Sequence, residues 1–253
     1  MKPTKFLACA VTVIAIAGCN SKQGNAATNG AAPTSVAHVA PPKNGDWSTV
    51  VTPTPAGGFM MGNPAAKVQL IEYGSMTCPH CREFDETGVT PLVNEYVKNG
   101  RVGYEFRNYV RDPYDLTASL IARCNGAKGF FPLERAIYKD QPNWVAKLQA
   151  VPQSQLEGLT NLPPNQQFLQ IAKLAGLQDW AAARGIPQAK SQQCLTDEKA
   201  VNQLVQMNSD ATTQFPDFQG TPTFVINGKM YEIKPGSPAW DQLKVGLSKA
   251  LGG

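Results

Sequence analysis

The sequence has few of the residues on which several common functions depend. Only two histidines, His38 and His80, occur in 253 residues. This scarcity excludes a His-rich metal site and leaves His80 as the one candidate base for Ser–His–Asp catalysis. Charged residues make up 17% of the chain, the formal net charge is only +4, and no dense basic run could follow a phosphate backbone. Nucleic-acid binding is therefore not expected, whereas 42% hydrophobic content is sufficient for a globular core.

The N-terminal apolar run is too short to cross a membrane. Thirteen mostly apolar residues, 6–18, follow a basic start; a spanning helix needs about twenty, and thirteen suits the core of a secretory signal. The run ends in Ile-Ala-Gly directly before Cys19, which resembles the lipobox of bacterial lipoproteins. This resemblance implies a signal peptide over residues 1–18 and a lipid anchor on Cys19. The alternative is an ordinary signal peptide cut near Gly18; in both cases the protein is exported.

A linker and one folded region are expected after the signal. Residues 19–46 contain mainly small and polar side chains, which cannot bury enough apolar surface to offset the entropy of ordering. We interpret them as a flexible tether, within which His38 is inert. The folded region is expected over residues 47–253, and the protein is expected in the periplasm, anchored to a bacterial membrane through Cys19.

Four cysteines remain after removal of Cys9 with the signal and lipidation of Cys19: Cys78, Cys81, Cys124 and Cys194. Export places them where disulfides persist. Sequence alone permits three pairings, but the CxxC spacing favours Cys78 with Cys81. Closing so short a loop stabilises the fold little, so this pair is better explained as one that exchanges its disulfide with other thiols. A Cys124–Cys194 bond would close a loop of about 70 residues and contribute roughly 4 kcal/mol, so we assign it a structural role.

The order of predicted elements places the CxxC motif in a βαβ unit. Residues 68–73 form a short apolar run typical of a strand, and apolar residues at helical spacing then continue from the motif to Asn99-Gly100. Pro91 falls inside this helix and is expected to kink it. Residues 102–107 alternate between large apolar and other residues, which predicts a second strand. The motif therefore lies at the first turn of the helix, where CxxC indicates redox chemistry.

The C-terminal part predicts a hairpin and a last helix. Residues 223–226 and 230–233 read as strands joined by a tight Asn227-Gly228 turn, and a helix opens after Ser237. Between the two halves, residues 112–200 show helical periodicity broken by loops, and the Pro-, Gln- and Asn-rich stretch 151–167 is predicted to be surface loop.

Three segments resemble the DsbA-like thiol–disulfide oxidoreductases: residues 57–64, Cys78-Pro79-His80-Cys81 and Gly220-Thr221-Pro222-Thr223. The resemblance covers about residues 47–253. It implies an α/β thioredoxin-like fold, a central mixed sheet flanked by helices, with a helical domain inserted at about residues 112–200.

The position of the motif indicates different roles for its two cysteines. A cysteine at a helix N-terminus faces unpaired backbone N–H groups and the positive end of the helix dipole, and both favour the thiolate. Cys78 is therefore expected to attack and Cys81 to resolve. His80 lies between them and, if protonated or donating, stabilises the thiolate further; the alternative is a solvated turn residue.

The resemblance adds three further site residues. It implies that Pro222 is a cis proline facing the sulfurs, that the backbone of Thr221 pairs with an extended substrate peptide, and that Glu72 is buried beneath the disulfide and assists proton transfer from Cys81. The residues by themselves also allow a trans proline at a strand start and an exposed or ion-paired acid on the strand.

These features together predict an exported oxidase that donates the Cys78–Cys81 disulfide to folding proteins through a mixed disulfide on Cys78. The resemblance implies reoxidation by a DsbB-like membrane partner; we expect a monomer that needs no cofactor or metal. Three alternatives stay open: a dithiol reductase or isomerase, a metal-binding module that uses Cys78, Cys81 and His80, and a peptide-binding lipoprotein whose CxxC is only structural.

Overall fold

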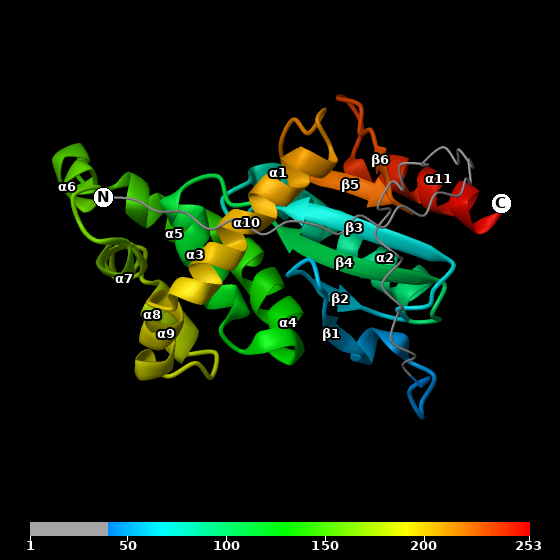
Figure 1. Ribbon diagram of the computed structural model, residues 1–253, viewed down its shortest axis with the longest axis horizontal. Coiled ribbons are helices and arrows are strands. Elements are labelled where there is room, and N and C mark those ends of the chain that lie inside the picture. The colour runs from blue at the N-terminus through cyan, green and yellow to red at the C-terminus, as the bar shows by residue number, and fades with distance from the viewer. Residues whose placement is uncertain (1–39) are drawn as a thin grey trace, which may run out of the picture. The chain divides into compact units, whose positions relative to one another are not determined.

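The structure is a computed structural model that describes residues 40–253 (Figure 1). The predicted signal peptide, the lipidation site Cys19 and the linker as far as residue 39 lie outside the described residues. Within residues 40–253, no helix combines the length and the apolar character that crossing a membrane requires.

One mixed sheet of six strands organises the described part, in the order β1-β2-β4-β3-β5-β6. Its strands are β1 (Val51–Pro53), β2 (Phe59–Met61), β3 (Val68–Gly74), β4 (Val102–Asn108), β5 (Thr223–Ile226) and β6 (Lys229–Tyr231). Only β3 and β4 pair in parallel; the other neighbours are antiparallel. The predicted α/β fold with a mixed sheet is confirmed, and β6 ends earlier than the predicted return strand.

The β5–β6 hairpin follows directly from its turn residues. Asn227 and Gly228 both have positive φ, 49° and 79°, the backbone that a two-residue hairpin needs and that Asn and Gly adopt most readily. The Asn227 side chain also accepts a hydrogen bond of 2.8 Å from the backbone N–H of Gln69. The turn is thereby attached to β3, which lies beside β5.

The α-helices are α1 (Pro79–Phe84), α2 (Thr90–Leu92), α3 (Pro113–Arg123), α4 (Gly126–Lys139), α5 (Gln141–Gln149), α6 (Gln153–Leu159), α7 (Pro164–Leu174), α8 (Leu177–Ala182), α9 (Gln188–Leu195), α10 (Glu198–Gln214) and α11 (Ala239–Leu251). A 3-10 helix, η1 (Trp47–Thr49), and two π-helical segments, η2 (Asp85–Val89) and η3 (Val93–Val97), are also present. Helices α3 to α10 lie between β4 and β5 in the chain, as the predicted insertion requires. The predicted helix after the motif runs from Pro79 to Val97, and its α-helical register changes to π-helical turns on both sides of Pro91. Proline has no N–H to donate, so it favours such an interruption.

The prediction of a surface loop over residues 151–167 is wrong. This stretch contains α6 and the first turn of α7. Pro152 and Pro163 stand at the N-caps of these two helices and Pro164 at the first turn of the second, positions where a missing N–H costs nothing. Most side chains of α6 are exposed, so the stretch lacks the apolar periodicity that would have revealed a helix.

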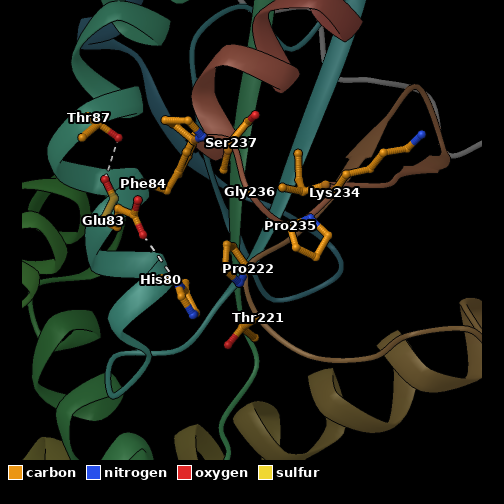
Figure 2. A pocket seen from close by; sticks show the side chains of 13 residues that line it. His80, Glu83, Phe84, Thr87, Thr221, Pro222, Lys234, Pro235, Gly236 and Ser237 are labelled. Carbon is orange, nitrogen blue, oxygen red and sulfur yellow. Dashed lines mark hydrogen bonds and ion pairs between the residues drawn. The ribbon is translucent and has the colours of Figure 1, made fainter.

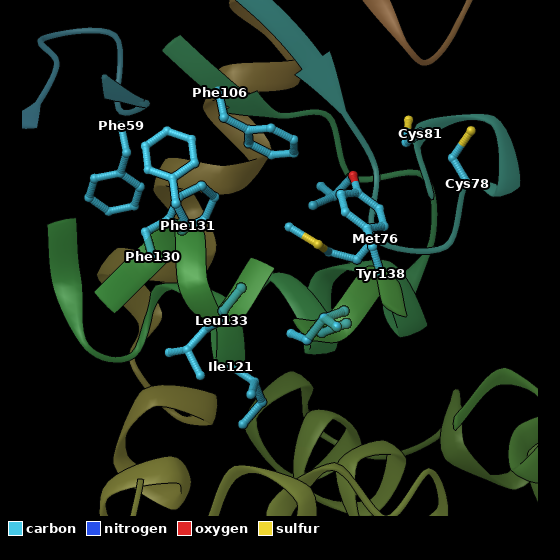
Figure 3. Close-up of a cluster of buried hydrophobic side chains, with 14 of the residues drawn as sticks. Phe59, Met76, Cys78, Cys81, Phe106, Ile121, Phe130, Phe131, Leu133 and Tyr138 are labelled. Atoms are coloured by element: carbon cyan, nitrogen blue, oxygen red, sulfur yellow. The ribbon is translucent and has the colours of Figure 1, made fainter. Parts of the chain in front are cut away.

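The sheet and the inserted helices share one apolar core (Figure 3). Aromatic rings join them: Phe130 of α4 lies 4.6 Å from Phe59 of β2 and 5.4 Å from Phe106 of β4, between ring centroids. Cys78 and Cys81 belong to the same buried cluster, together with Met76 of the preceding loop. The redox motif is thus anchored in packing that includes both parts of the fold.

A disulfide joins Cys124, at the C-terminal end of α3, to Cys194 of α9, with 5.6 Å between the Cα atoms. The bond spans 70 residues of the chain, and the pair is the one that we predicted. The bond links α3 to α9 within the insertion and closes the long loop between them.

Removing this disulfide is expected to destabilise the fold strongly. In the double variant Cys124→Ala/Cys194→Ala, the free energy of unfolding should fall by about 4 kcal/mol, because the unfolded chain regains the entropy of the open loop. Urea unfolding in oxidising buffer measures the change. In a reducing buffer that opens both disulfides, the variant and the wild type should unfold at nearly the same urea concentration; a difference that persists there would contradict the assignment.

Candidate active site

The CxxC motif lies where β3 leads into α1. Strand β3 ends at Gly74, where a Cβ atom would lie 2.5 Å from the Phe106 ring, so glycine permits the close approach. Cys78 is the N-cap of α1 in extended backbone conformation, and Pro79 occupies the first turn, where proline favours helix initiation. Both motif cysteines are free thiols here; the structure describes the reduced form.

The Cys78 thiol has a pKa far below that of an ordinary cysteine. Hydrogen bonding from the Cys81 side chain is the largest cause that lowers its pKa to about 5; burial opposes it, and the Thr221 side chain and the backbone N–H groups of Cys81 and His80 add to the lowering. At neutral pH Cys78 is therefore mainly thiolate, the reactive form of cysteine. The two backbone donors belong to the first turn of α1, as expected for a cysteine at a helix N-terminus, whereas Thr221 comes from the segment before β5.

Cys81 has the opposite properties. Its side chain is fully buried, and burial, followed by the hydrogen bond to Cys78 and by the Cys78 charge, raises its pKa well above that of an ordinary thiol. A buried protonated thiol cannot initiate attack on an external disulfide. It lies within reach of Cys78, however, which suits the resolving role.

The segment around Pro222 reaches Cys78 from the far end of the chain. Strand β5 runs antiparallel to β3, with Thr223 opposite Tyr73, so the start of β5 lies beside the end of β3. The Thr221–Pro222 bond is cis, and the trans alternative is wrong. In the protonated state the Cys78 thiol donates to the Thr221 carbonyl at 3.1 Å, and the buried Thr221 hydroxyl then has no hydrogen-bond partner within the described part of the chain. That hydroxyl is available to the thiolate.

Glu72 is a buried acid of β3, only 1% exposed. The Tyr104 hydroxyl donates to its Oε2 at 2.5 Å. Burial raises the pKa of Glu72 to about 8; the Tyr104 hydrogen bond opposes this, and the charges of Asp85 and Cys78 add to it. The exposed alternative is therefore wrong. A carboxyl group with this pKa can gain or lose a proton near neutral pH, and its charge affects the pKa of Cys81.

Other buried acids were not predicted, and two of them affect the pKa of groups at this site. Glu134 of α4 and Asp85, next to α1, are 2% and 5% exposed. Burial raises the pKa of Asp85 to about 6, although the nearby Arg135 guanidinium, with Nε 3.3 Å from Oδ1, opposes this; burial also raises the pKa of Glu134 well above its usual range. Glu134 follows Phe130 at the i+4 spacing of a buried helix face, and this pattern could have revealed it.

The His80 side chain agrees with the alternative of a solvated turn residue and not with a side chain that stabilises the thiolate. It is 76% exposed, and its Nδ1 lies 3.4 Å from Glu83 Oε2. The residue supports the thiolate through its backbone N–H, because a helix N-terminus directs N–H groups towards the cap and side chains outwards. Within residues 40–253 no three His, Cys, Asp or Glu side chains form a group that could hold a metal ion.

A groove of about 580 Å³ lies beside the cis proline (Figure 2). His80, Glu83 and Phe84 of α1 line one side of it, and Pro222 with residues 233–239, the segment that leads into α11, lines the other. The sequence did not predict this groove, since it forms between segments about 150 residues apart. Thr221 also lines the groove, and its carbonyl accepts the hydrogen bond from Cys78, so the groove begins close to the redox motif.

Comparison with known proteins agrees with this geometry. A family model described as Thioredoxin matches residues 54–244. The chain belongs to the thioredoxin family. A Rickettsia bellii relative named "Putative protein-disulfide oxidoreductase" is 30% identical over 188 residues, 73% of this chain and 63% of the relative. This chain thus spans about three fifths of the length of the Rickettsia relatives that it matches.

Solved structures with a similar fold cover more than three quarters of the chain. A structure described as a protein-disulfide isomerase from Novosphingobium aromaticivorans is 32% identical, with a TM-score of 0.71, over 77% of this chain and 97% of that one. Alpha-DsbA1 from Wolbachia pipientis is 24% identical, with a TM-score of 0.61, over 79% of this chain and 93% of that one. The second likeness shows the fold alone.

Proposed function

We propose that the protein is a thiol:disulfide oxidoreductase that donates the Cys78–Cys81 disulfide to folding exported proteins. A client thiolate attacks the Cys78 sulfur, the bond to Cys81 breaks, and a mixed disulfide forms while Cys81 leaves as a thiolate that takes up a proton. A second client thiolate then attacks the client sulfur of the mixed disulfide and releases the Cys78 thiolate. The client loses two electrons and the Cys78–Cys81 pair gains them.

The observation that carries this proposal is the contrast between the two sulfurs. Cys78 has a pKa of about 5 and Cys81 one well above the usual thiol value. A low pKa makes Cys78 a good leaving group and stabilises the reduced protein, and both make the disulfide a stronger oxidant. The groove beside Pro222 would hold the client residues that flank the attacking cysteine.

The proposed location of the protein in the cell is inferred from its N-terminal sequence. The basic start, the thirteen-residue apolar run and Cys19 support export to the periplasm and a lipid anchor on a bacterial membrane. There, a DsbB-like membrane partner would reoxidise the pair after each transfer. Mass spectrometry of the mature protein tests the anchor: acylation of Cys19 supports it, and an unmodified N-terminus elsewhere contradicts it.

A second function, isomerase or reductase, is favoured by one comparison. The solved structure at 32% identity is described as a protein-disulfide isomerase. An isomerase must be reduced in its resting state so that Cys78 can attack incorrect disulfides. The direction of net transfer therefore distinguishes the two functions.

The redox equilibrium with glutathione is the decisive measurement. We expect residues 20–253 to have a Cys78–Cys81 potential closer to about −120 mV than to about −270 mV, since the depressed Cys78 pKa stabilises the reduced pair. Alkylation followed by mass spectrometry reports each cysteine pair separately. A potential near the lower value would support the reductase, and a pair that does not exchange would refute dithiol catalysis.

A further inference from the structure

The loop before Cys78 depends on the inserted helices for its polar contacts. Ser75 and Met76 are fully buried, so their backbone groups need partners inside the protein. Three inserted side chains supply them: the Tyr138 hydroxyl donates to the Ser75 carbonyl at 3.1 Å, Asp115 Oδ1 accepts from the Met76 N–H at 2.8 Å, and Gln141 Nε2 donates to the Met76 carbonyl at 2.8 Å.

Gln141 is the member of this set that reaches the redox motif itself. It is the first residue of α5 and is 5% exposed. Its Nε2 also donates to the carbonyl of Cys78 at 3.0 Å. The amide group therefore donates to the carbonyls of Met76 and Cys78, the residues on either side of Thr77. The Cys78 carbonyl also accepts the Arg82 N–H at 3.2 Å, the first hydrogen bond of α1. One side chain thus holds both the loop and the start of the helix.

We propose that Gln141 is a positioning residue for the redox centre: from the inserted domain it fixes the turn that directs backbone N–H groups at the Cys78 sulfur. The inference rests on the proposed function, in which the reduced pair must be stabilised. Donors at fixed positions stabilise a thiolate more than they stabilise an uncharged disulfide sulfur. Loss of Gln141 therefore destabilises the reduced protein more than the oxidised protein.

The test uses Gln141→Met, which keeps the length of the side chain and removes its donors. Gln149→Met is the matched control, because Gln149 ends the same helix and is exposed. In the mature protein, we expect the equilibrium constant for reduction of the Cys78–Cys81 disulfide by glutathione to fall roughly fivefold in Gln141→Met, the scale of one net hydrogen bond. The control should match the wild type. Thermal unfolding should show a larger loss for the reduced form than for the oxidised form.

A purely structural role gives a different result. Both redox forms would then lose stability equally, and by linkage the equilibrium constant with glutathione would stay at the wild-type value; this result, or a larger loss in the oxidised form, overturns the proposal. If Gln141→Met does not fold, Gln141→Glu keeps the shape and replaces the NH2 donor by an acceptor, with a fall of at least the same size expected. The wild-type protein is assayed in parallel, since its failure to exchange would refute the proposed function and not the role of Gln141.

Discussion

Replacing Cys78 by serine is expected to reduce disulfide exchange to the uncatalysed rate, whereas replacing Cys81 by serine is expected to trap the client. Cys78 is the ionised thiol, with a pKa of about 5, and a serine hydroxyl in its place cannot form a disulfide. In Cys81→Ser the thiolate of Cys78 still attacks a client disulfide, but the buried sulfur that would resolve the mixed disulfide is missing. A covalent adduct of up to one client per chain should accumulate.

Non-reducing gel electrophoresis and mass spectrometry after incubation with an oxidised model client measure both outcomes. Cys124→Ala/Cys194→Ala is the matched control, because it removes the other cysteine pair and leaves the motif intact. Its exchange rate should equal that of the wild type at a temperature where it is folded. Adducts on Cys78→Ser, or none on Cys81→Ser, would contradict the assigned roles.

Local patterns were sufficient for the elements that surround the motif. The strand before Cys78, the alternation in residues 102–107 and the Asn227-Gly228 turn each express a rule that operates within a few residues, and β3, β4 and the β5–β6 hairpin confirm them. The backbone donors at Cys78 were likewise predictable, since an N-cap position determines which N–H groups face the sulfur, whereas the Thr221 side chain that also lowers its pKa comes from a distant segment.

Contacts between distant segments could not be predicted in the same way. Strands β1 and β2 have three residues each, too few to show a period, and are defined by pairing along the sheet. The contact between Gln141 and the Cys78 carbonyl joins residues 63 positions apart, and nothing in the sequence near Gln141 indicates it. The sequence also suggested that the His80 side chain stabilises the Cys78 thiolate. In the structure the backbone N–H of His80 does so.

Glu72→Gln is expected to slow release of the client from Cys78 by attack of Cys81, the reverse of the first step of client oxidation, by roughly 10²-fold, the lower range for loss of a general base. We propose that the Glu72 carboxylate accepts the Cys81 proton as Cys81 attacks the mixed disulfide. The wild-type release rate should rise with pH, reach half of its maximum near pH 8, the pKa of Glu72, and level off above that pH. Burial is the main cause of that pKa and the Cys78 charge a minor one, so the value stays raised when Cys78 is bonded to the client. Stopped-flow release from a labelled adduct measures the profile.

The same carboxyl group links stability to pH, which provides an independent check. Its pKa is about 8 when folded and 4.5 ordinarily, so between these values the folded chain holds a proton that the unfolded chain has lost, and the free energy of unfolding falls as pH rises. Glu72→Gln should reduce this fall, as measured by urea unfolding between pH 4.5 and 8. Tyr104→Phe removes the one hydrogen bond that lowers this pKa and should move the release profile to higher pH. If Glu72→Gln leaves both profiles unchanged, Glu72 is not the proton acceptor, and the proton of Cys81 must leave by way of another group.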